Sequence, residues 1–427
     1  MELEGRGTPA VVVGTQEFRP LALADARARG MAELAVVSVP HPIGGIAEDR
    51  VALKADGGYQ SLVETLEAAA RGRAGAGAGR TRSASSLAAP DDLIAFQGWA
   101  MEHGWGDGLP LLPPTPERVE QLLKGTGRAG DEELTILPPR LGRATVEVVA
   151  INAALAGALP EHMPVIVAAI EAVGDPAFNL RAIQATTHPC SPLLVVNGPI
   201  AGRLGVNAAG NALGQGARAN AVIGRAVRLV LQNSGGARPG SEDRATLGHP
   251  GKYTYCLAEH EAASPWESLA VERGFGRDDS TVTVCGAEGP HNINDHASTT
   301  AEGILATVAG TVAQIGSNNV YLDGEPLIAL GPEHAATVAA AGWSKADFKR
   351  RLFDAARVPI RRFGRENREH FEIRNPPRYA GLSDDATVAV TDRWENLMVI
   401  VAGGAGKHSA VMFTFGSTRA ITRRIDG

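Results

Sequence analysis

A short glycine-bounded stretch, residues 286–296 (GAEGPHNINDH), concentrates side chains suited to proton transfer or metal binding. His291, Asp295 and His296 follow an apolar run that ends in Cys285. Imidazole beside carboxylate suits general acid–base catalysis near neutral pH, and the same groups with a thiolate are ligands for zinc or iron. We therefore take these three residues as candidate catalytic groups, and Cys285, His291 and His296 as candidate ligands for Zn or Fe. The alternative is an exposed loop in which Asn and Asp only cap neighbouring elements.

A second cluster, residues 248–266 (GHPGKYTYCLAEHEAASPW), carries Lys252, Cys256 and Glu259 along one segment. A cysteine near basic groups can have a lowered pKa and react as a thiolate. Cys256 is therefore a candidate nucleophile alongside Cys285, Glu259 is a further candidate catalytic residue, and Lys252 is a candidate substrate-binding cation. The alternative is that Cys256 packs inertly in a buried strand, as free cysteines commonly do.

A third stretch, residues 403–409 (GGAGKHS), resembles an anion-binding turn, because its backbone N–H groups can converge and its lysine adds positive charge. The spacing departs from the P-loop pattern, since Val401 and His408 stand where glycine and Ser or Thr are required. A small carboxylate or phosphate fits such a turn better than a nucleoside triphosphate, and a plain tight turn is the alternative. The candidate substrate-binding residues here are Gly403, Gly404, Gly406, Lys407 and His408.

Four apolar strands are expected to position these groups, each running into glycine: residues 193–197, 281–285, 327–330 and 397–402. Strand, glycine turn and helix is typical of a parallel α/β sheet, in which ligands bind beyond the carboxyl ends of the strands. Asn197 ends the first strand and His334 follows the third, so both are candidate substrate-binding residues. If the strands are parallel neighbours, His291, His334 and His408 should lie within about 15 Å of one another, or about three strand spacings.

The remaining pattern predicts an α/β protein in two parts. A small α/β module spans residues 1–70, with strands at 10–13 and 35–39. A linker of Gly, Ala, Arg and Ser spans residues 71–89, and a larger α/β domain spans 90–427 and carries the candidate site. Helices in the larger part are expected at 117–124, 146–156, 163–173, 219–232, 298–314 and 334–341, and a capping box at Ser344 starts another.

Composition narrows the class of partner. The 427 residues are too many for one ordinary domain, and the net charge of −6 without a long basic run disfavours nucleic acid. The apolar runs are too short to span a membrane, and the sequence does not open with a signal peptide. With only three cysteines, a reducing compartment is expected. We therefore expect a cytoplasmic protein with a small-molecule substrate, forming a homo-oligomer, with no nucleic-acid or membrane partner.

Residues 2–45, with ELEGRGTPAVVVGTQEFRPLA and VVSVPHPIGG, resemble the UGSC family of (seleno)proteins. Residues 187–347 resemble the long companion domain found with such modules in bacteria, through THPCSPLLVVNGPI, GHPGKYTYC, ASPWESLAVERGF, GPHNINDHAS and LGPEHAATVAAAGWSKAD. The resemblance implies an α/β module with redox-active thiol or selenol chemistry. The family's signature, Cys or Sec followed by Gly-Ser-Cys, belongs just upstream of residues 2–8, and no cysteine precedes Cys190. We expect either that the motif lies upstream of Met1 or that the module has lost its redox pair.

Three functions are compatible with these patterns. The leading hypothesis is an enzyme acting on a small polar or anionic metabolite through thiol and histidine chemistry in the larger domain. An oxidoreductase or a lyase is favoured, and redox chemistry is implied by the resemblance. The second is a metal-dependent lyase or hydrolase that uses His291, His296, His334 and His408. The third is a non-catalytic partner subunit of a separate thiol or selenol protein.

The linker prediction can be tested by limited proteolysis. Trypsin should cut first within residues 71–86, where arginines lie in low-complexity sequence, and should release two fragments before either is degraded further. Resistance of this stretch, with first cuts elsewhere, would contradict the division into two parts.

Overall fold

The structure is a computed structural model that describes residues 10–28, 31, 34–41, 48–71 and 86–426. The chain divides into two compact units, Met1–Leu87 and Ala88–Gly427, and each is described by itself. The predicted linker falls mostly on residues 72–85, which lie outside the described residues.

In its described residues, the first unit is a small α/β arrangement built on one pair of strands. β1 (Val11–Thr15) and β2 (Ala35–Val39) are parallel, in a register that places Val11 opposite Ala35. Parallel neighbours need a crossover connection, and α2 (Arg19–Ala28) lies in it. The long helix α3 (Glu48–Arg71) follows β2.

The second unit contains two four-stranded sheets that share one pattern of strand directions. The first sheet has the order β14-β7-β5-β6, and the second has the order β12-β9-β13-β8. The bounds in the first sheet are β5 (Ser191–Asn197), β6 (Cys256–Ala258), β7 (Thr281–Ala287) and β14 (Ile421–Arg424). Those in the second are β8 (His291–Asn294), β9 (Leu327–Leu330), β12 (Met398–Val401) and β13 (His408–Met412).

Each sheet is mixed. β5 is parallel to β6 and β9 is parallel to β12, whereas β7, β14, β13 and β8 pair antiparallel with their neighbours. The predicted α/β class is confirmed, but a largely parallel sheet is not. Helices lie between β5 and β6 and between β9 and β12, where parallel crossovers require them, while the short connection from β12 to β13 returns the chain antiparallel.

One edge strand returns from the second sheet to the first. The second sheet is built from one continuous stretch of the chain, β8 to β13, whereas the first sheet takes β5, β6 and β7 from before that stretch and β14 from after it. Below, the first half of the unit is the chain up to β7 and the second half is the chain from β8 to β13. The halves cannot separate without losing the antiparallel pairing of β14 with β7.

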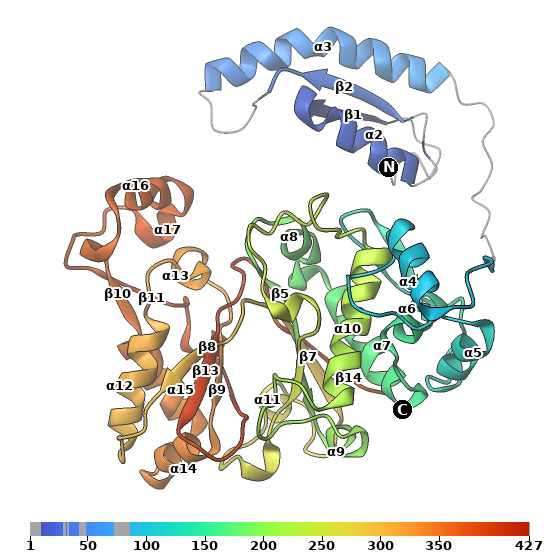
Figure 1. Cartoon of the computed structure of the whole chain (residues 1–427). Coiled ribbons are helices and arrows are strands. Elements are labelled where there is room, and N and C mark those ends of the chain that lie inside the picture. The colour runs from blue at the N-terminus through green and yellow to red at the C-terminus, as the bar shows by residue number, and fades with distance from the viewer. Residues whose placement is uncertain (1–9, 29–30, 32–33, 42–47, 72–85, 427) are drawn as a thin grey trace. The chain divides into compact units, whose positions relative to one another are not determined.

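Alternate side chains of the strands face opposite layers, as the two-residue period of a strand requires. Leu194 and Val196 of β5 pack into a core with the helices of the first half, while Leu193 and Val195 pack against the second sheet. Figure 1 shows the result: α6, α7 and α10 flank one sheet, α12 and α15 flank the other, and the strands lie between them. The unit is thus a layered arrangement of helices, sheet, sheet and helices.

Helix ends follow local capping chemistry. Asp92 accepts hydrogen bonds from Ile94 N and Ala95 N at the start of α4, and Ser344 forms a capping box with Asp347 at the start of α15. The helices on the first half are α4 (Leu93–Glu102), α5 (Pro116–Lys124), α6 (Val146–Ala156), α7 (Met163–Val173), α8 (Leu180–Ala185), α9 (Pro199–Leu204), α10 (Arg218–Asn233) and α11 (Leu269–Glu272). Those on the second half are α12 (Ala301–Val312), α13 (Asn318–Leu322), α14 (Pro332–Ala340), α15 (Lys345–Ala355), α16 (Arg365–Arg374) and α17 (Pro376–Tyr379).

Two antiparallel strand pairs lie outside the main sheets: β3 (Glu133–Leu137) with β4 (Gly142–Thr145), and β10 (Arg357–Pro359) with β11 (Thr387–Ala389). Among the described helices, no single one is both long and apolar enough to cross a membrane. One bent pair, Pro160–Val173 with Pro176–Ala185, reaches that length and composition only when its two helices are taken together.

The return of β14 to the first sheet predicts that this strand stabilises the whole second unit. A chain ending at Arg419 should melt about 5–10 °C lower than the full chain, because β7 loses its antiparallel neighbour and the buried Ile425 is removed. A chain lacking only Asp426 and Gly427 is the control and should melt normally. Melting can be followed by circular dichroism. An equal melting temperature for all three chains would contradict a stabilising role for the pairing of β14 with β7.

Candidate functional site

Two predicted residues meet where the parallel strands β5 and β6 end. Asn197 is the last residue of β5, and Glu259 follows the last residue of β6. The Asn197 side-chain amide donates to Glu259 Oε2 at 2.7 Å, and the Leu269 backbone N–H donates to the same oxygen at 2.7 Å. Both side chains are buried. These two bonds fix the carboxyl group and leave Glu259 Oε1 without a hydrogen-bond partner.

A buried lysine from the other half of the unit faces this carboxyl group. Lys345, in the first turn of α15, is 2% exposed, and its Nζ lies 3.9 Å from Glu259 Oε1. The Lys345 ammonium group has no hydrogen-bond partner, although Glu272 Oε2 lies 3.6 Å away. Asn197 Oδ1 is likewise buried and unpartnered. Buried polar atoms are almost always hydrogen-bonded, so three unpartnered atoms in one cluster mark a place where water or a ligand completes the bonding.

Burial raises the pKa of Glu259 above its usual value, although the charge of Lys345 acts in the opposite direction. Carboxyl groups shifted in this way are frequent at catalytic sites, because a pKa closer to neutral lets the group both accept and donate a proton. From the sequence, the segment from Ser344 to Asp347 is expected only to cap a helix. The one signal for a further role is that a lysine in the first turn of a helix opposes the helix dipole.

Acidic side chains line the other side of the cluster. Glu261 Oε1 accepts hydrogen bonds from Asn197 Nδ2 at 3.0 Å and from the Gly198 backbone N–H at 2.7 Å. Glu272 is bound by Lys349 and has a side chain that is a quarter exposed. The cluster therefore alternates carboxylates with ammonium groups from the buried Glu259 outward to Glu272.

The predicted histidines form a second group at the end of the other sheet. His334 is buried, with Nδ1 2.7 Å from Ser409 Oγ and Nε2 3.0 Å from the Asp295 carbonyl oxygen. Since a carbonyl only accepts, Nε2 carries the proton and Nδ1 accepts from the Ser409 hydroxyl. His334 thereby links α14 to the start of β13 and to the loop after β8.

His408 pairs with His296 rather than with His291. Their Nε2 atoms lie 3.1 Å apart, and both side chains are exposed. His291 begins β8, and its register partner is Val411 rather than His408, so it lies about 10 Å, or three residues, back along the strand. The expectation of parallel neighbours holds for β9 and β12 but is wrong for β7, which lies in the other sheet and pairs antiparallel with β5. The separation of about 10 Å along β8 is within the expected spread of about 15 Å, but His291 has no part in the hydrogen bond between His296 and His408.

Hydrogen bonds within the loop after β8 and to α12 hold the Asp295 side chain in place. Its carboxylate accepts from the Ser298 backbone N–H at 2.9 Å and from the Thr307 hydroxyl at 2.7 Å. Burial alone would disfavour the charged form, but these hydrogen bonds outweigh it and lower the pKa of Asp295 to about 2. The group is thus a fixed carboxylate at neutral pH, which suits positioning of the loop after β8 better than proton transfer.

The glycine turn at residues 403–406 is used for packing. Gly403 and Gly406 have positive φ values of 108° and 130°, and a Cβ at Gly404 would lie 2.8 Å from Gly210 Cα. The N–H groups of Gly403 and Gly406 already donate, to the Ala208 carbonyl and to Glu333 Oε1. An anion nest therefore has little support here, although the turn does hold the loops of the two halves together.

The two predicted lysines are also engaged. The Lys407 ammonium donates to the carbonyl oxygens of His296 and Ser298, each at 3.3 Å. Lys252 forms an ion pair with Asp243 at 2.7 Å, and it lies near the start of β5 and β6, opposite to Asn197. Lys252 is therefore not brought together with the other predicted substrate-binding residues.

The three cysteines are buried in different surroundings. Cys190, Cys256 and Cys285 are at most 3% exposed, and all are free thiols. Desolvation raises the pKa of each to about 12. At neutral pH these groups are protonated, so the structure offers no support for a thiolate nucleophile. In the described part of the chain, no group of three or more His, Cys, Asp or Glu residues could surround a metal ion, and Cys285 is packed away from the histidine pair.

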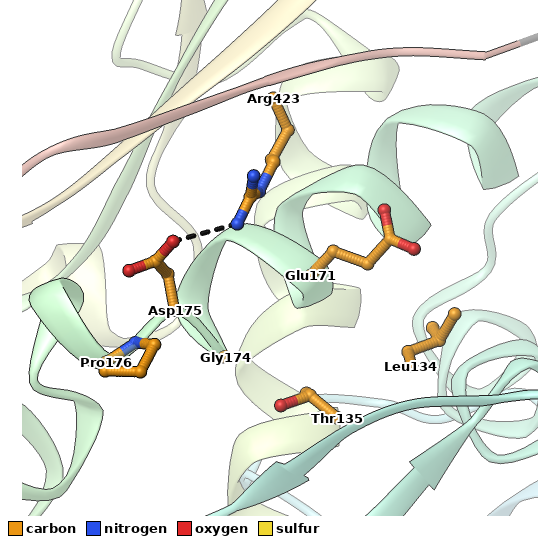
Figure 2. Close-up of a pocket in the computed structure, with 7 residues that line it drawn as sticks. All are labelled: Leu134, Thr135, Glu171, Gly174, Asp175, Pro176 and Arg423. Carbon is orange, nitrogen blue, oxygen red and sulfur yellow. Dashed lines mark hydrogen bonds and ion pairs between the residues drawn. The ribbon is translucent and has the colours of Figure 1, made fainter.

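A surface cleft of about 440 Å³ lies elsewhere, where the loop after α7 meets β3 and β14, and none of the predicted residues lines it. Figure 2 shows Arg423 reaching Asp175, with 2.8 Å between the guanidinium nitrogen and the carboxylate oxygen. Glu171 on the same wall is paired with Arg128. The acidic groups of this cleft are thus already paired with arginines, so we place the candidate site at the ends of β5 and β6 instead.

Thiol burial gives a direct test. In the native protein none of the three cysteines should react with Ellman's reagent at the rate of free glutathione, because thiols with a pKa of about 12 are neither ionised nor accessible. All three should react after unfolding in guanidinium.

Since an unfolded cysteine ionises near pH 9 but the folded ones do not, the free energy of unfolding should also fall as pH rises above 9. A rapidly reacting native thiol would restore the nucleophile hypothesis.

No curated protein and no solved structure matches the chain. A family model matches residues 1–68. These residues include none of the strands β5 to β14, so the strand-end site described above has no counterpart in the match. The N-terminal part of the chain, residues 1–68, matches the UGSC family, as its sequence resemblance predicted.

Proposed function

We propose that the second unit is an enzyme that moves a proton on a small polar or anionic metabolite, with Glu259 as the acid–base group. The single observation that carries the proposal is the unpartnered Oε1 of Glu259, which lies 3.9 Å from the unpartnered Nζ of Lys345. The two groups form an ion pair but no hydrogen bond, so an oxygen of a ligand could bond to both.

Each group has a defined part. Asn197 and the Leu269 N–H hold Glu259 Oε2, so the other oxygen points in one direction. The raised pKa of Glu259 suits a group that takes a proton from a substrate and returns it. Lys345 binds the oxygen on which negative charge develops, and because it is buried, its interaction with that charge is little screened by water.

The location supports the same proposal. In α/β sheets ligands bind beyond the carboxyl ends of parallel strands, and Asn197 and Glu259 stand at the ends of the parallel pair β5 and β6. The adjoining end of β12 is joined to this place, because the His260 N–H donates to the Val401 carbonyl at 2.7 Å. The site thus draws on both halves of the unit.

The proposed reaction can be screened in D2O. The full-length protein is incubated with small carboxylic acids, 2-oxo acids and amino acids, and proton NMR follows loss of C–H signals or appearance of products. For any compound that reacts, Glu259→Gln should lower the rate by about 10²–10⁴-fold, which is the usual contribution of a general base. Glu267→Gln, a change at an exposed glutamate eight residues away, is the matched control and should leave the rate unchanged.

A second measurement keeps the proposal testable without a known substrate. Infrared difference spectra between the wild type and Glu259→Gln should show a protonated carboxyl band that persists above pH 4.5, the ordinary pKa of glutamic acid. If that band disappears at the ordinary pKa and no compound in the panel reacts, Glu259 and Lys345 serve only to join the two halves, and the proposal fails.

A further inference from the structure

The histidine pair at the end of the second sheet brings two imidazole nitrogens together on exposed side chains. His296 lies in the loop after β8, and His408 is the first residue of β13. Their Nε2 atoms are 3.1 Å apart, and their rings meet edge to face, with centroids separated by 4.9 Å. Neither side chain is buried, so the space beside the two nitrogens is open to solvent.

The tautomer of His408 is set by a neighbouring amide. His408 Nδ1 lies 2.9 Å from Asn292 Oδ1. An amide oxygen only accepts, so Nδ1 carries the proton and Nε2 of the neutral ring presents a lone pair toward His296. This is the arrangement by which metal-binding histidines are commonly oriented, with the remote ring nitrogen donating to an oxygen.

The distance between the two nitrogens matches a shared metal ion. Zinc binds imidazole nitrogen at about 2.0–2.1 Å. Two such bonds at a right angle separate the nitrogens by about 3.0 Å, and at a tetrahedral angle by about 3.4 Å. The observed 3.1 Å lies within this interval.

The backbone on both sides of the pair is held in place. β8 and β13 pair in a register that sets His408 opposite Asn294. Lys407 Nζ donates to the His296 carbonyl, and His334 Nε2 donates to the carbonyl of Asp295, the residue before His296. The two ligands are therefore preorganised, and little ordering is required when an ion binds.

We propose that His296 and His408 bind a divalent transition-metal ion of the zinc and copper class. Imidazole nitrogen suits Zn²⁺, Cu²⁺ and Ni²⁺, whereas Mg²⁺ and Ca²⁺ prefer oxygen ligands. The described residues supply only these two side chains as ligands, so water or a small ligand fills the remaining positions. The site is independent of Glu259, Asn197 and Lys345.

The test is metal binding by the full-length protein. Equilibrium dialysis with ZnCl₂ should give one ion per chain, and His296→Ala and His408→Ala should each weaken that affinity at least tenfold. His291→Ala is the matched control, because it removes an exposed histidine from β8, the strand just before His296, and leaves both rings of the pair in place.

Copper gives an independent readout. With one equivalent of CuSO₄, the electron paramagnetic resonance spectrum should show two equatorial nitrogens, and one in either single variant. If the wild type binds zinc no more tightly than the His296→Ala/His408→Ala double variant, the two rings form only an N–H···N hydrogen bond and the proposal is overturned. Loss of zinc binding would leave the acid–base role of Glu259 untouched, so the two proposals fail separately.

Discussion

The second unit depends on burying both faces of its central strands. β5 turns Leu194 and Val196 toward helices and Leu193 and Val195 toward the opposite sheet, and β9 does the same with Ile328 and Leu330 on one side and Leu327 and Ala329 on the other. The inner faces of the two sheets therefore share one apolar layer. Because each strand must satisfy two cores at once, its register cannot slip by a single residue without exposing a row of apolar side chains. This constraint fixes where every strand ends, and hence where the polar groups that follow the strands come to lie.

The pairing of distant segments adds a second constraint that acts on the candidate sites. β8 carries Asn292 to His408, and the loop after it places His296 against the same ring. β8 and β13 are the first and last strands of the second sheet along the chain, so the histidine pair exists only when that sheet is complete. The Glu259–Lys345 cluster instead joins the two halves, because Glu259 follows β6 of the first sheet and Lys345 begins α15 in the second half.

Electrostatics separates the roles of residues that resemble one another in the sequence. Glu259 and Asp295 are both buried carboxylic acids just after a strand. Burial dominates at Glu259 and raises its pKa, whereas hydrogen bonds from Ser298 and Thr307 dominate at Asp295 and lower its pKa to about 2. The first is suited to exchanging a proton and the second to holding a loop. The cysteines show the same dependence on surroundings, since desolvation without a nearby strong cation keeps them protonated.

Local chemistry in the sequence determined the elements: β9, α6 and α7 have the bounds expected from apolar periodicity, and the capping box at Ser344 starts a helix as expected. Asn197 and Glu259 were candidate site residues in two separate segments of the sequence, and the structure brings their side chains into a hydrogen bond. Strand direction and sheet membership were decided only by tertiary structure, because an apolar run has the same pattern whether its neighbour is parallel, antiparallel or in another sheet. For that reason His296 rather than His291 meets His408, and Lys345, expected from the sequence only as part of a helix cap, faces the buried Glu259.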